Sequence, residues 1–220
     1  MGKTYIITGV YGSGKTEFCV NLALRLARSG GSVTIADMDV INPYFRSRER
    51  EDDLADAGIE IIGSSISNKN IQDLPAISFG FISRIRNREN VIIDLAGGEN
   101  GLKLLARCYE AICDYEFLCV FNPFRPETVS AEQMVNFAKT VNSLTKLPLT
   151  GFVNNGNLLR ETTAEHVLYA QSIIKDAAQQ MNLPIKYTLL QSDIRSKIAG
   201  NLLSDDVIIF DELQMRKSWQ

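Results

Sequence analysis

Short runs of apolar, mostly β-branched residues alternate with longer segments of helical periodicity along the 220 residues of this chain. Most of the short runs are continuously apolar, which is typical of strands buried on both faces. A strand, a helix and a further strand in succession form a right-handed crossover, which places the two strands parallel in one sheet. The pattern therefore predicts a single α/β domain over residues 1–220, with a mostly parallel sheet of about seven strands between helices.

The bounds of these elements follow from the same periodicity. The predicted strands are Tyr5–Thr8, Val33–Asp37, Ile59–Ile62, Val91–Asp94, Phe117–Phe121, Gly151–Val153 and Lys186–Leu190. The predicted helices are Lys15–Ser29, Ala76–Asn87, Gly101–Ala111, Glu127–Leu144 and Ala164–Met181. Thr162 and Glu165 have the spacing of a capping box, which is expected to open the last helix. The stretch Met38–Glu51 fits neither period, and a polar loop of that length in a compact domain is usually functional.

A glycine-rich segment connects the first predicted strand to the first predicted helix. Its sequence, Gly9-Val-Tyr-Gly-Ser-Gly-Lys15-Thr16, satisfies the pattern G-x-x-x-x-G-K-[ST]. Glycines let backbone N–H groups wrap around a diphosphate, and the helix N-terminus adds partial positive charge. Lys15 is expected to reach the β- and γ-phosphates, and Thr16 to supply a hydroxyl to Mg²⁺. The segment predicts a nucleoside triphosphate site, with these binding residues: Gly9, Tyr11, Gly12, Ser13, Gly14, Lys15, Thr16 and Glu17.

Aspartates follow two further predicted strands. Asp94 closes one of them and precedes Gly97 and Gly98, and Asp37 closes another, with Asp39 two residues later. Ligands of a parallel α/β sheet bind beyond the carboxyl ends of its strands, so these carboxylates are expected near the metal. Candidate metal ligands are therefore Thr16, Asp37 and Asp94, and candidate catalytic residues are Lys15, Asp39 and Asp94. The alternative for each aspartate is a turn or helix cap.

Together these motifs resemble the MinD/ParA-like branch of the SIMIBI-class P-loop NTPases, also described as the CobQ/CobB/MinD/ParA nucleotide-binding domain. That family has a Walker A loop, a D-x-D with an Asn soon after, and a later D-x-x-G. The counterparts here are Gly9–Thr16, Asp37–Asp39 with Asn42, and Asp94–Gly97. The resemblance covers most of the chain and implies a three-layer P-loop NTPase fold with ATP and Mg²⁺ as cofactors.

The resemblance also implies two residue roles. Asp39 matches the position that polarises the attacking water, and Asn154 matches an adenine-contacting Asn. The run Asn154-Asn-Gly-Asn157 is equally compatible with a turn. Because the chain contains no N-K-x-D guanine motif, ATP is favoured over GTP.

One position departs from the family pattern. MinD and ParA proteins carry a signature lysine early in the Walker A loop, which reaches across a nucleotide-sandwich dimer, whereas this chain has Val10 there. The dimer mechanism therefore does not carry over, and a homodimer stays open. Arg46, Arg48 or Arg125 can supply a replacement cation, or each can be a solvated or structural arginine.

The motifs are compatible with three classes of function. The favoured one is a slow Mg-ATP-dependent ATPase that acts as a switch on a protein partner, through changes in Met38–Glu51 and Gly97–Gly101. The alternative is a small-molecule kinase or ATP-dependent ligase of the dethiobiotin-synthetase type, with acceptor or lid arginines at Arg84, Arg86 and Arg88. A nucleotide-binding scaffold with negligible turnover is the third.

Composition restricts partners and location. A net charge of −3 argues against a nucleic-acid-binding or anionic-membrane surface spread over the molecule. No apolar run approaches the roughly 20 residues of a membrane span, and the first residues lack a signal-peptide layout, so a cytoplasmic protein without a membrane partner is expected. The 4 cysteines form no C-x-x-C pair, which favours reduced, buried thiols over a zinc or iron–sulfur site. His166, the single histidine, is expected to be at the surface or half-buried.

Overall fold

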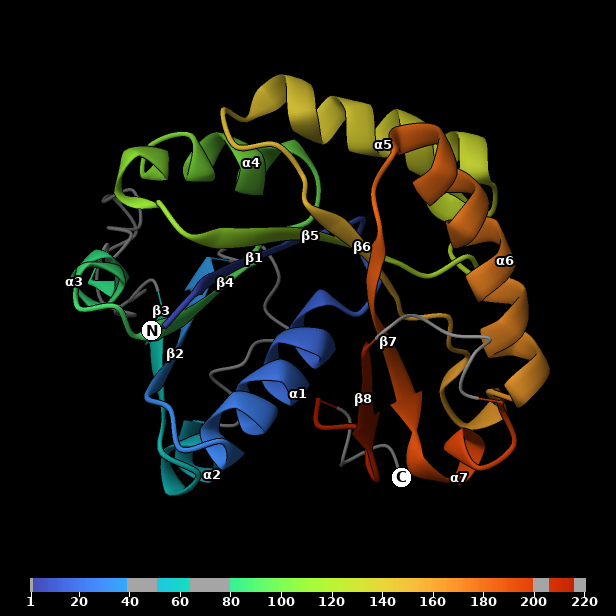
Figure 1. Ribbon diagram of the computed structural model, residues 1–220, viewed down its shortest axis with the longest axis horizontal. Helices are drawn as coiled ribbons and strands as arrows, with labels where there is room; N and C mark the ends of the chain where they lie inside the picture. The colour runs from blue at the N-terminus through green and yellow to red at the C-terminus, as the bar shows by residue number, and fades with distance from the viewer. Residues whose placement is uncertain (1, 39–50, 64–79, 200–205, 216–220) are drawn as a thin grey trace, which may run out of the picture.

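A parallel sheet runs through the whole molecule. The computed structural model describes residues 2–38, 51–63, 80–199 and 206–215 (Figure 1). Within these residues, 8 strands form one sheet in the order β3-β2-β4-β1-β5-β6-β7-β8. Every strand pair in this sheet is parallel. Helices cover both faces, so the predicted three-layer α/β fold is confirmed.

The strands match the apolar runs of the sequence closely. Their bounds are β1 (Thr4–Thr8), β2 (Val33–Met38), β3 (Ile59–Gly63), β4 (Asn90–Leu95), β5 (Tyr115–Phe121), β6 (Gly151–Asn154), β7 (Ile185–Gln191) and β8 (Asp206–Phe210). The seven predicted strands are all present. The prediction missed β8, an apolar run that adds an eighth strand beside β7 at one edge of the sheet.

The helices differ more from the prediction. They are α1 (Lys15–Arg28), α2 (Glu51–Asp56), α3 (Phe81–Arg86), α4 (Glu99–Leu105), α5 (Ala131–Leu144), α6 (Ala164–Met181) and α7 (Ser192–Arg195). The predicted helix Gly101–Ala111 divides into α4 and the 3₁₀ turn Tyr109–Ala111. The start of the predicted helix Glu127–Leu144 forms the 3₁₀ turn Pro126–Thr128, and α5 begins only after its N-cap Ser130. Residues 76–79 of the predicted helix before β4 lie outside the described residues.

The capping box of α6 lies one residue later than predicted. The hydroxyl of Thr163 accepts a hydrogen bond from the His166 backbone N–H at 3.3 Å, and His166 Nδ1 accepts one from the Thr163 N–H at 3.2 Å. Thr163 has the extended backbone of an N-cap, with φ −121° and ψ 167°. Thr162 instead accepts a hydrogen bond from the Leu158 N–H within the preceding turn. The imidazole of the half-buried His166 thus fills the role assigned to Glu165.

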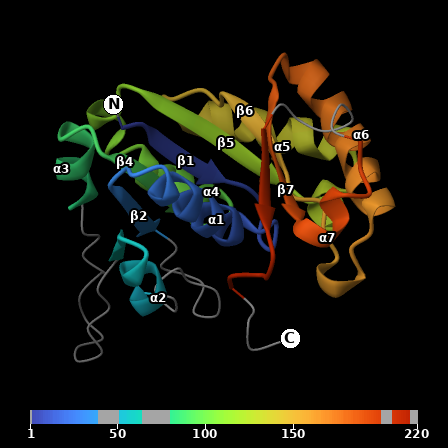
Figure 2. The ribbon, with the colours of Figure 1, turned by 60° about the horizontal axis from the view of Figure 1, so that its bottom comes forward.

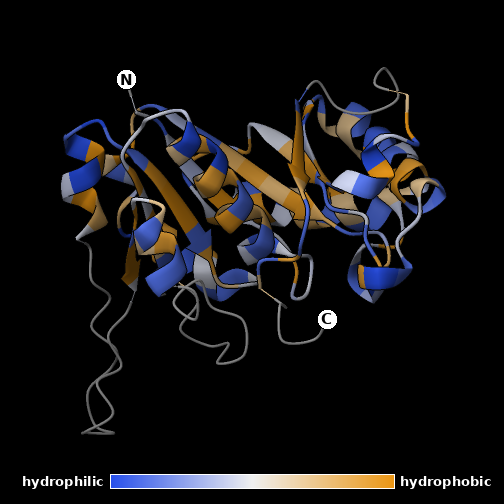
Figure 3. Ribbon diagram, turned by 90° about the horizontal axis from the view of Figure 1, so that it is seen from below, coloured by the Kyte–Doolittle hydropathy of each residue, from blue (hydrophilic) through white to orange (hydrophobic). Residues whose placement is uncertain are grey.

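Two apolar cores lie on the two faces of the sheet. On one face, α3 to α6 contribute residues such as Phe81, Leu105 and Val141. On the other, α1 and α2 contribute residues such as Phe18 and Leu54. Figure 2 shows α1 and α2 on the near side, with α4 and α5 behind the sheet. In Figure 3 the strands are mainly hydrophobic and the helices carry hydrophilic residues on their outer sides, as burial of both sheet faces requires. No helix in the described ranges is long and apolar enough to cross a membrane.

The carboxyl ends of β1, β2, β4 and β5 lie side by side near the middle of the sheet, on the side where all its parallel strands end. β1 pairs with β4 on one side and β5 on the other, whereas the next strand along the chain, β2, lies beyond β4. The strand order therefore reverses direction at β1. In open α/β sheets such a switch point leaves a crevice beyond the strand ends, where ligands bind.

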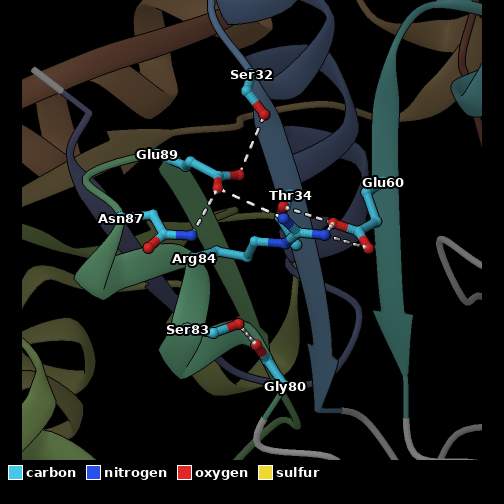
Figure 4. A network of polar contacts seen from close by, with 8 residues as sticks. All are labelled: Ser32, Thr34, Glu60, Gly80, Ser83, Arg84, Asn87 and Glu89. Atoms are coloured by element: carbon cyan, nitrogen blue, oxygen red, sulfur yellow. Dashed lines mark hydrogen bonds and ion pairs between the residues drawn. The ribbon is translucent and has the colours of Figure 1, made fainter.

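A polar network lies at the opposite ends of the strands, where β2, β3 and β4 begin (Figure 4). Arg84 of α3 pairs with Glu60 at 2.9 Å and with Glu89 at 3.5 Å. Thr34 donates to Glu60 and Ser32 to Glu89, which ties α3 to the starts of β2, β3 and β4. Arg84 is thus part of a structural network far along the strands from their carboxyl ends. Arg88 lies at the same end of the strands, where its carbonyl accepts the Gly2 N–H, so these arginines give no support to the lid role considered for a kinase.

Candidate functional site

The glycine-rich loop between β1 and α1 has a backbone that its residue types permit. Gly14 is the N-cap of α1 and has φ 88° and ψ 29°, in the left-handed region. A Cβ placed on Gly14 would lie 2.0 Å from Nδ2 of Asn155, so a side chain is excluded there by space as well as by backbone conformation. Asn155 donates from this nitrogen to the Ser13 carbonyl at 2.7 Å and so holds the loop against the end of β6.

Lys15 folds back over this loop. Its side chain is buried, and its Nζ donates to the Val10 carbonyl at 3.1 Å. Gly97, in the loop after β4, lies directly beside it. A Cβ built on Gly97 would be 3.3 Å from the Tyr11 backbone nitrogen and 3.4 Å from Lys15 Nζ. Two donors of the loop and one glycine of the D-x-x-G segment therefore converge on a single point.

The candidate metal ligands gather next to that point. The Thr16 hydroxyl donates to Asp94 Oδ2 at 2.7 Å. Asp37 and Asp94 are direct register partners on the neighbouring strands β2 and β4, and both are buried. Register partners in a parallel sheet point to the same face, which brings the two carboxylates and the hydroxyl together.

This donor set fits Mg²⁺, which prefers oxygen ligands. Among the described residues there is no group of three His, Cys, Asp or Glu side chains that could hold a metal. Mg²⁺ in nucleotide sites is commonly held by one or two protein oxygens, with phosphate oxygens and water completing the octahedron. The hydroxyl of Thr16 and the carboxylates of Asp94 and Asp37 are sufficient for that mode of binding.

A cavity of about 290 Å³ opens beside the loop and is lined by four separate segments. The loop and the start of α1 contribute residues from Tyr11 to Glu17, and the loop after β5 contributes Arg125 to Glu127. The loop after β6 and the segment after β8 contribute the rest, namely Asn155, Asn157, Leu159, Leu213 and Met215. The cavity therefore joins the glycine-rich loop to a wall of amide and apolar side chains, a combination of polar and apolar lining that is typical of small-molecule sites.

Asn154 and Asn155 have different environments. Asn154 is fully buried, where its Nδ2 donates to Gln171 of α6 at 2.8 Å and its Oδ1 accepts the Gly156 N–H at 2.9 Å. Asn155, the next residue, lines the cavity. The structure therefore brings Asn155 and Asn157 to the cavity, and it engages Asn154 in packing between β6 and α6. The sequence marks the run Asn154-Asn-Gly-Asn157, but which of its asparagines faces the cavity depends on where β6 ends.

Arg125 reaches the glycine-rich loop between β1 and α1 from the loop after β5. Its Nε donates to the Gly12 carbonyl at 2.9 Å. Of the three arginines considered as replacements for the signature lysine, it is the one in the described residues, and it lies at the cavity. Arg46 and Arg48, together with Asp39 and Asn42, lie outside the described residues.

Sequence reasoning missed Leu213 and Met215. They follow β8 and line the cavity, although no motif marks them, because their contribution is apolar surface. The strand-like run Asp206–Phe210 was the available signal, since a further strand beside β7 would return the chain toward the carboxyl ends of the sheet.

No protein-family model matches this chain, and no curated protein sequence matches it significantly. Solved structures do match it. The cell division protein FtsY of Thermotoga maritima superposes with a TM-score of 0.59 at 23% identity, covering 86% of this chain and 61% of that one. Chloroplast FtsY of Physcomitrella patens gives a TM-score of 0.59 at 20% identity, covering 86% and 58%.

A third match is the signal recognition particle receptor FtsY of Elizabethkingia anophelis in complex with GDP, with a TM-score of 0.55 at 20% identity, covering 86% of this chain and 57% of that one. This chain thus spans about three fifths of the length of these proteins. Identities this low show the fold alone. This chain shares the three-layer α/β fold of these structures, and the match does not single out the MinD/ParA-like branch.

Proposed function

We propose that this chain is a nucleotide-dependent switch that binds ATP with Mg²⁺, hydrolyses it slowly and is sensed by a protein partner. The observation that carries the proposal is the convergence of Lys15 Nζ, the Tyr11 N–H and Gly97 beside the Thr16–Asp94 hydrogen bond. A terminal phosphate at this point would contact the loop and the D-x-x-G segment at once. Its loss on hydrolysis would release that segment, which is how many P-loop proteins report their nucleotide state.

The chain's own residues supply distinct parts of the chemistry. Lys15 and the backbone N–H groups of the loop would hold the β- and γ-phosphates, and their positive potential stabilises charge that develops during transfer. Thr16, Asp37 and Asp94 would hold Mg²⁺, which neutralises phosphate charge when it is bound. Orientation of the attacking water by Asp39 stays a prediction.

Adenine is the base that the residues of this site favour. The residue three positions after Asn155 is Leu158, so the chain lacks the aspartate with which an N-K-x-D motif reads guanine. The wall of Leu213, Met215 and Leu159 offers apolar contact to either purine. One matching FtsY structure is a complex with GDP, so the test compares GTP with ATP.

Thermal unfolding with and without nucleotide tests the proposal. A ligand that binds only the folded state stabilises it by RT ln(1 + [L]/Kd), about 2.7 kcal/mol at a hundredfold excess over Kd. For a domain of this size that raises Tm by roughly 5–11 °C. We expect this shift with Mg-ATP and a smaller one with Mg-GTP at equal concentration.

Lys15→Ala should abolish the shift, whereas Lys139→Ala, which removes an exposed lysine of α5, should retain it. The absence of any shift with millimolar ATP or GTP would refute nucleotide binding. Equal shifts with the two would refute the preference for adenine. Release of rapid ADP production by a small-molecule acceptor would favour the kinase alternative over the switch.

A further inference from the structure

Glu17 is a buried carboxylate that the motif places among the expected binding residues but to which the proposed function assigns no chemical step. It lies in the first turn of α1, immediately after Thr16, and its side chain accepts hydrogen bonds from three groups of the described residues. Its Oε1 accepts from the Gln214 N–H at 2.8 Å and from Asn21 Nδ2 at 2.7 Å. Its Oε2 accepts from the Met215 N–H at 2.9 Å. One carboxylate therefore binds two consecutive backbone N–H groups of the segment after β8.

These hydrogen bonds connect that segment to the first turn of α1. Residues 211–215 have left the sheet, so their N–H groups need partners other than a neighbouring strand. Hydrogen bonds to an ionised carboxylate are shorter and stronger than neutral ones, and two of them in parallel also fix orientation. The position of Glu17 in the first helical turn adds the favourable field of the helix N-terminus. Gln214 is 197 positions from Glu17 in the sequence, yet the carboxylate binds two particular backbone N–H groups of the segment.

The attachment determines the shape of the cavity. Leu213 and Met215 flank Gln214, pack against the core beneath α1, and line the cavity together with Gly14 and Lys15. Asn155, Asn157 and Leu159 of the loop after β6 line it as well. Phosphates need only the glycine-rich loop, so the apolar wall formed by Leu213 and Met215 is available to the base and sugar.

We propose that Glu17 is a positioning residue that holds the segment 211–215 against α1 and thereby forms the wall for the purine base of a bound nucleoside triphosphate. The proposal rests on the proposed nucleotide site and adds how that site gains affinity for a nucleoside over phosphate alone. Nucleotide binding should in turn stabilise the segment, because ligand and Glu17 hold the same residues from opposite sides.

The first test compares ATP with inorganic tripolyphosphate, both with Mg²⁺, by calorimetric titration. In Glu17→Ala we expect ATP affinity to fall about tenfold and tripolyphosphate affinity to change less than about twofold. Glu17→Gln keeps one acceptor oxygen and should give an intermediate loss. Glu132→Ala is the matched control, because Glu132 is exposed in the first turn of the equally long helix α5. Equal losses for ATP and tripolyphosphate would overturn the proposal, since they would indicate a general effect on the phosphate-binding loop.

The second test uses the wild-type protein, first without any ligand and then with ATP or tripolyphosphate. Amide exchange, followed by NMR, should show slow exchange of the Gln214 and Met215 N–H groups in the free wild-type protein. ATP should slow both further, and tripolyphosphate should not. Fast exchange of these two amides in the free protein, or identical slowing by the two ligands, would overturn the proposal. Failure of wild type to bind either ligand would instead refute the nucleotide site, while slow exchange would still support attachment by Glu17.

Discussion

Gly97 and Gly98 are adjacent in the sequence, yet the structure predicts opposite consequences for replacing them with alanine. Gly98 has φ 75° and ψ −159°, a conformation that essentially only glycine adopts. A Cβ there meets no atom of residues 2–38, 51–63, 80–199 or 206–215 within 4 Å, so backbone strain is the cost of Gly98→Ala that the structure supports. We expect a loss of about 1–3 kcal/mol in the free energy of unfolding, or roughly 2–12 °C in Tm.

Gly97→Ala should leave stability almost unchanged and impair the site. No left-handed φ is required at Gly97, and the new methyl would contact Tyr11 N at 3.3 Å and the flexible end of Lys15 at 3.4 Å. Small adjustments relieve those contacts, and the alanine reduces the entropy of the unfolded chain, an effect worth about 0.4–1 kcal/mol. The two terms offset each other, so Tm should stay close to that of wild type.

The methyl group of Gly97→Ala would, however, occupy the point on which the two loop donors converge. Losing one hydrogen bond to a charged phosphate costs about 1.5–3 kcal/mol, equivalent to a fall in affinity of roughly 10- to 150-fold. A non-hydrolysable ATP analogue should show this loss, and ADP, which lacks the terminal phosphate, should bind Gly97→Ala nearly as it binds wild type.

Urea unfolding of the free proteins and calorimetric titration with both nucleotides measure the two effects separately. The control is built into the pair, because each variant should change the property that the other preserves. If Gly97→Ala binds the ATP analogue as wild type does, the terminal phosphate does not lie between Lys15 and Gly97. If both variants lose the same stability, the backbone difference between the two glycines is not the cause.

Three further predictions concern the carboxylates, the arginine and the thiols. Asp94→Ala should weaken Mg²⁺-dependent ATP binding by about 10- to 100-fold, as titration with and without EDTA would show, whereas Asp39→Ala should retain binding and suppress hydrolysis in a phosphate-release assay. Arg125→Ala should lower the affinities for ATP and ADP about equally, by roughly tenfold, because the Arg125 guanidinium donates a hydrogen bond to the loop itself. Unchanged affinity with a large loss of turnover would assign Arg125 a direct catalytic role instead. A thiol reagent at pH 8 should react quickly with the exposed Cys113 alone. Burial raises the pKa of the Cys108 thiol to about 11 and also shields Cys19 and Cys119 from the reagent. Rapid reaction of more than one thiol would contradict this prediction.

The thiol pattern also corrects one sequence-based expectation. Four buried, reduced thiols were expected, and three are buried, whereas Cys113 is exposed beside the start of β5. Cys19 is fully buried in α1, and its pKa is raised by burial and by the nearby Asp94 carboxylate. Asp94 is also a candidate metal ligand, a role that requires an ionised carboxylate. A Cys19 thiol that stays protonated and unreactive is compatible with that role.

Local pattern was sufficient to predict seven of the 8 strands of the described sheet and to single out the glycine-rich loop between β1 and α1. Continuous apolar runs such as Val91–Asp94 can be read directly, because a strand covered on both faces needs apolar side chains at every position. The loop can be read for a similar reason: the glycines, Lys15 and Thr16 are consecutive, and their geometry follows from a short stretch of backbone. Helix starts were less predictable, since Thr162 and Thr163 are both competent caps and the choice between them depends on the turn that precedes α6.

Only the tertiary structure decided which side chains share the cavity. Asn155 rather than Asn154 faces the loop because β6 ends at Asn154 and directs that residue toward α6. Glu17 meets Gln214 only because β8 adds to the sheet edge and returns the chain to α1. Hydrophobic periodicity and motif spacing report on residues a few positions apart. Contacts between segments almost two hundred residues apart depend instead on strand order, which the packing of the whole sheet determines.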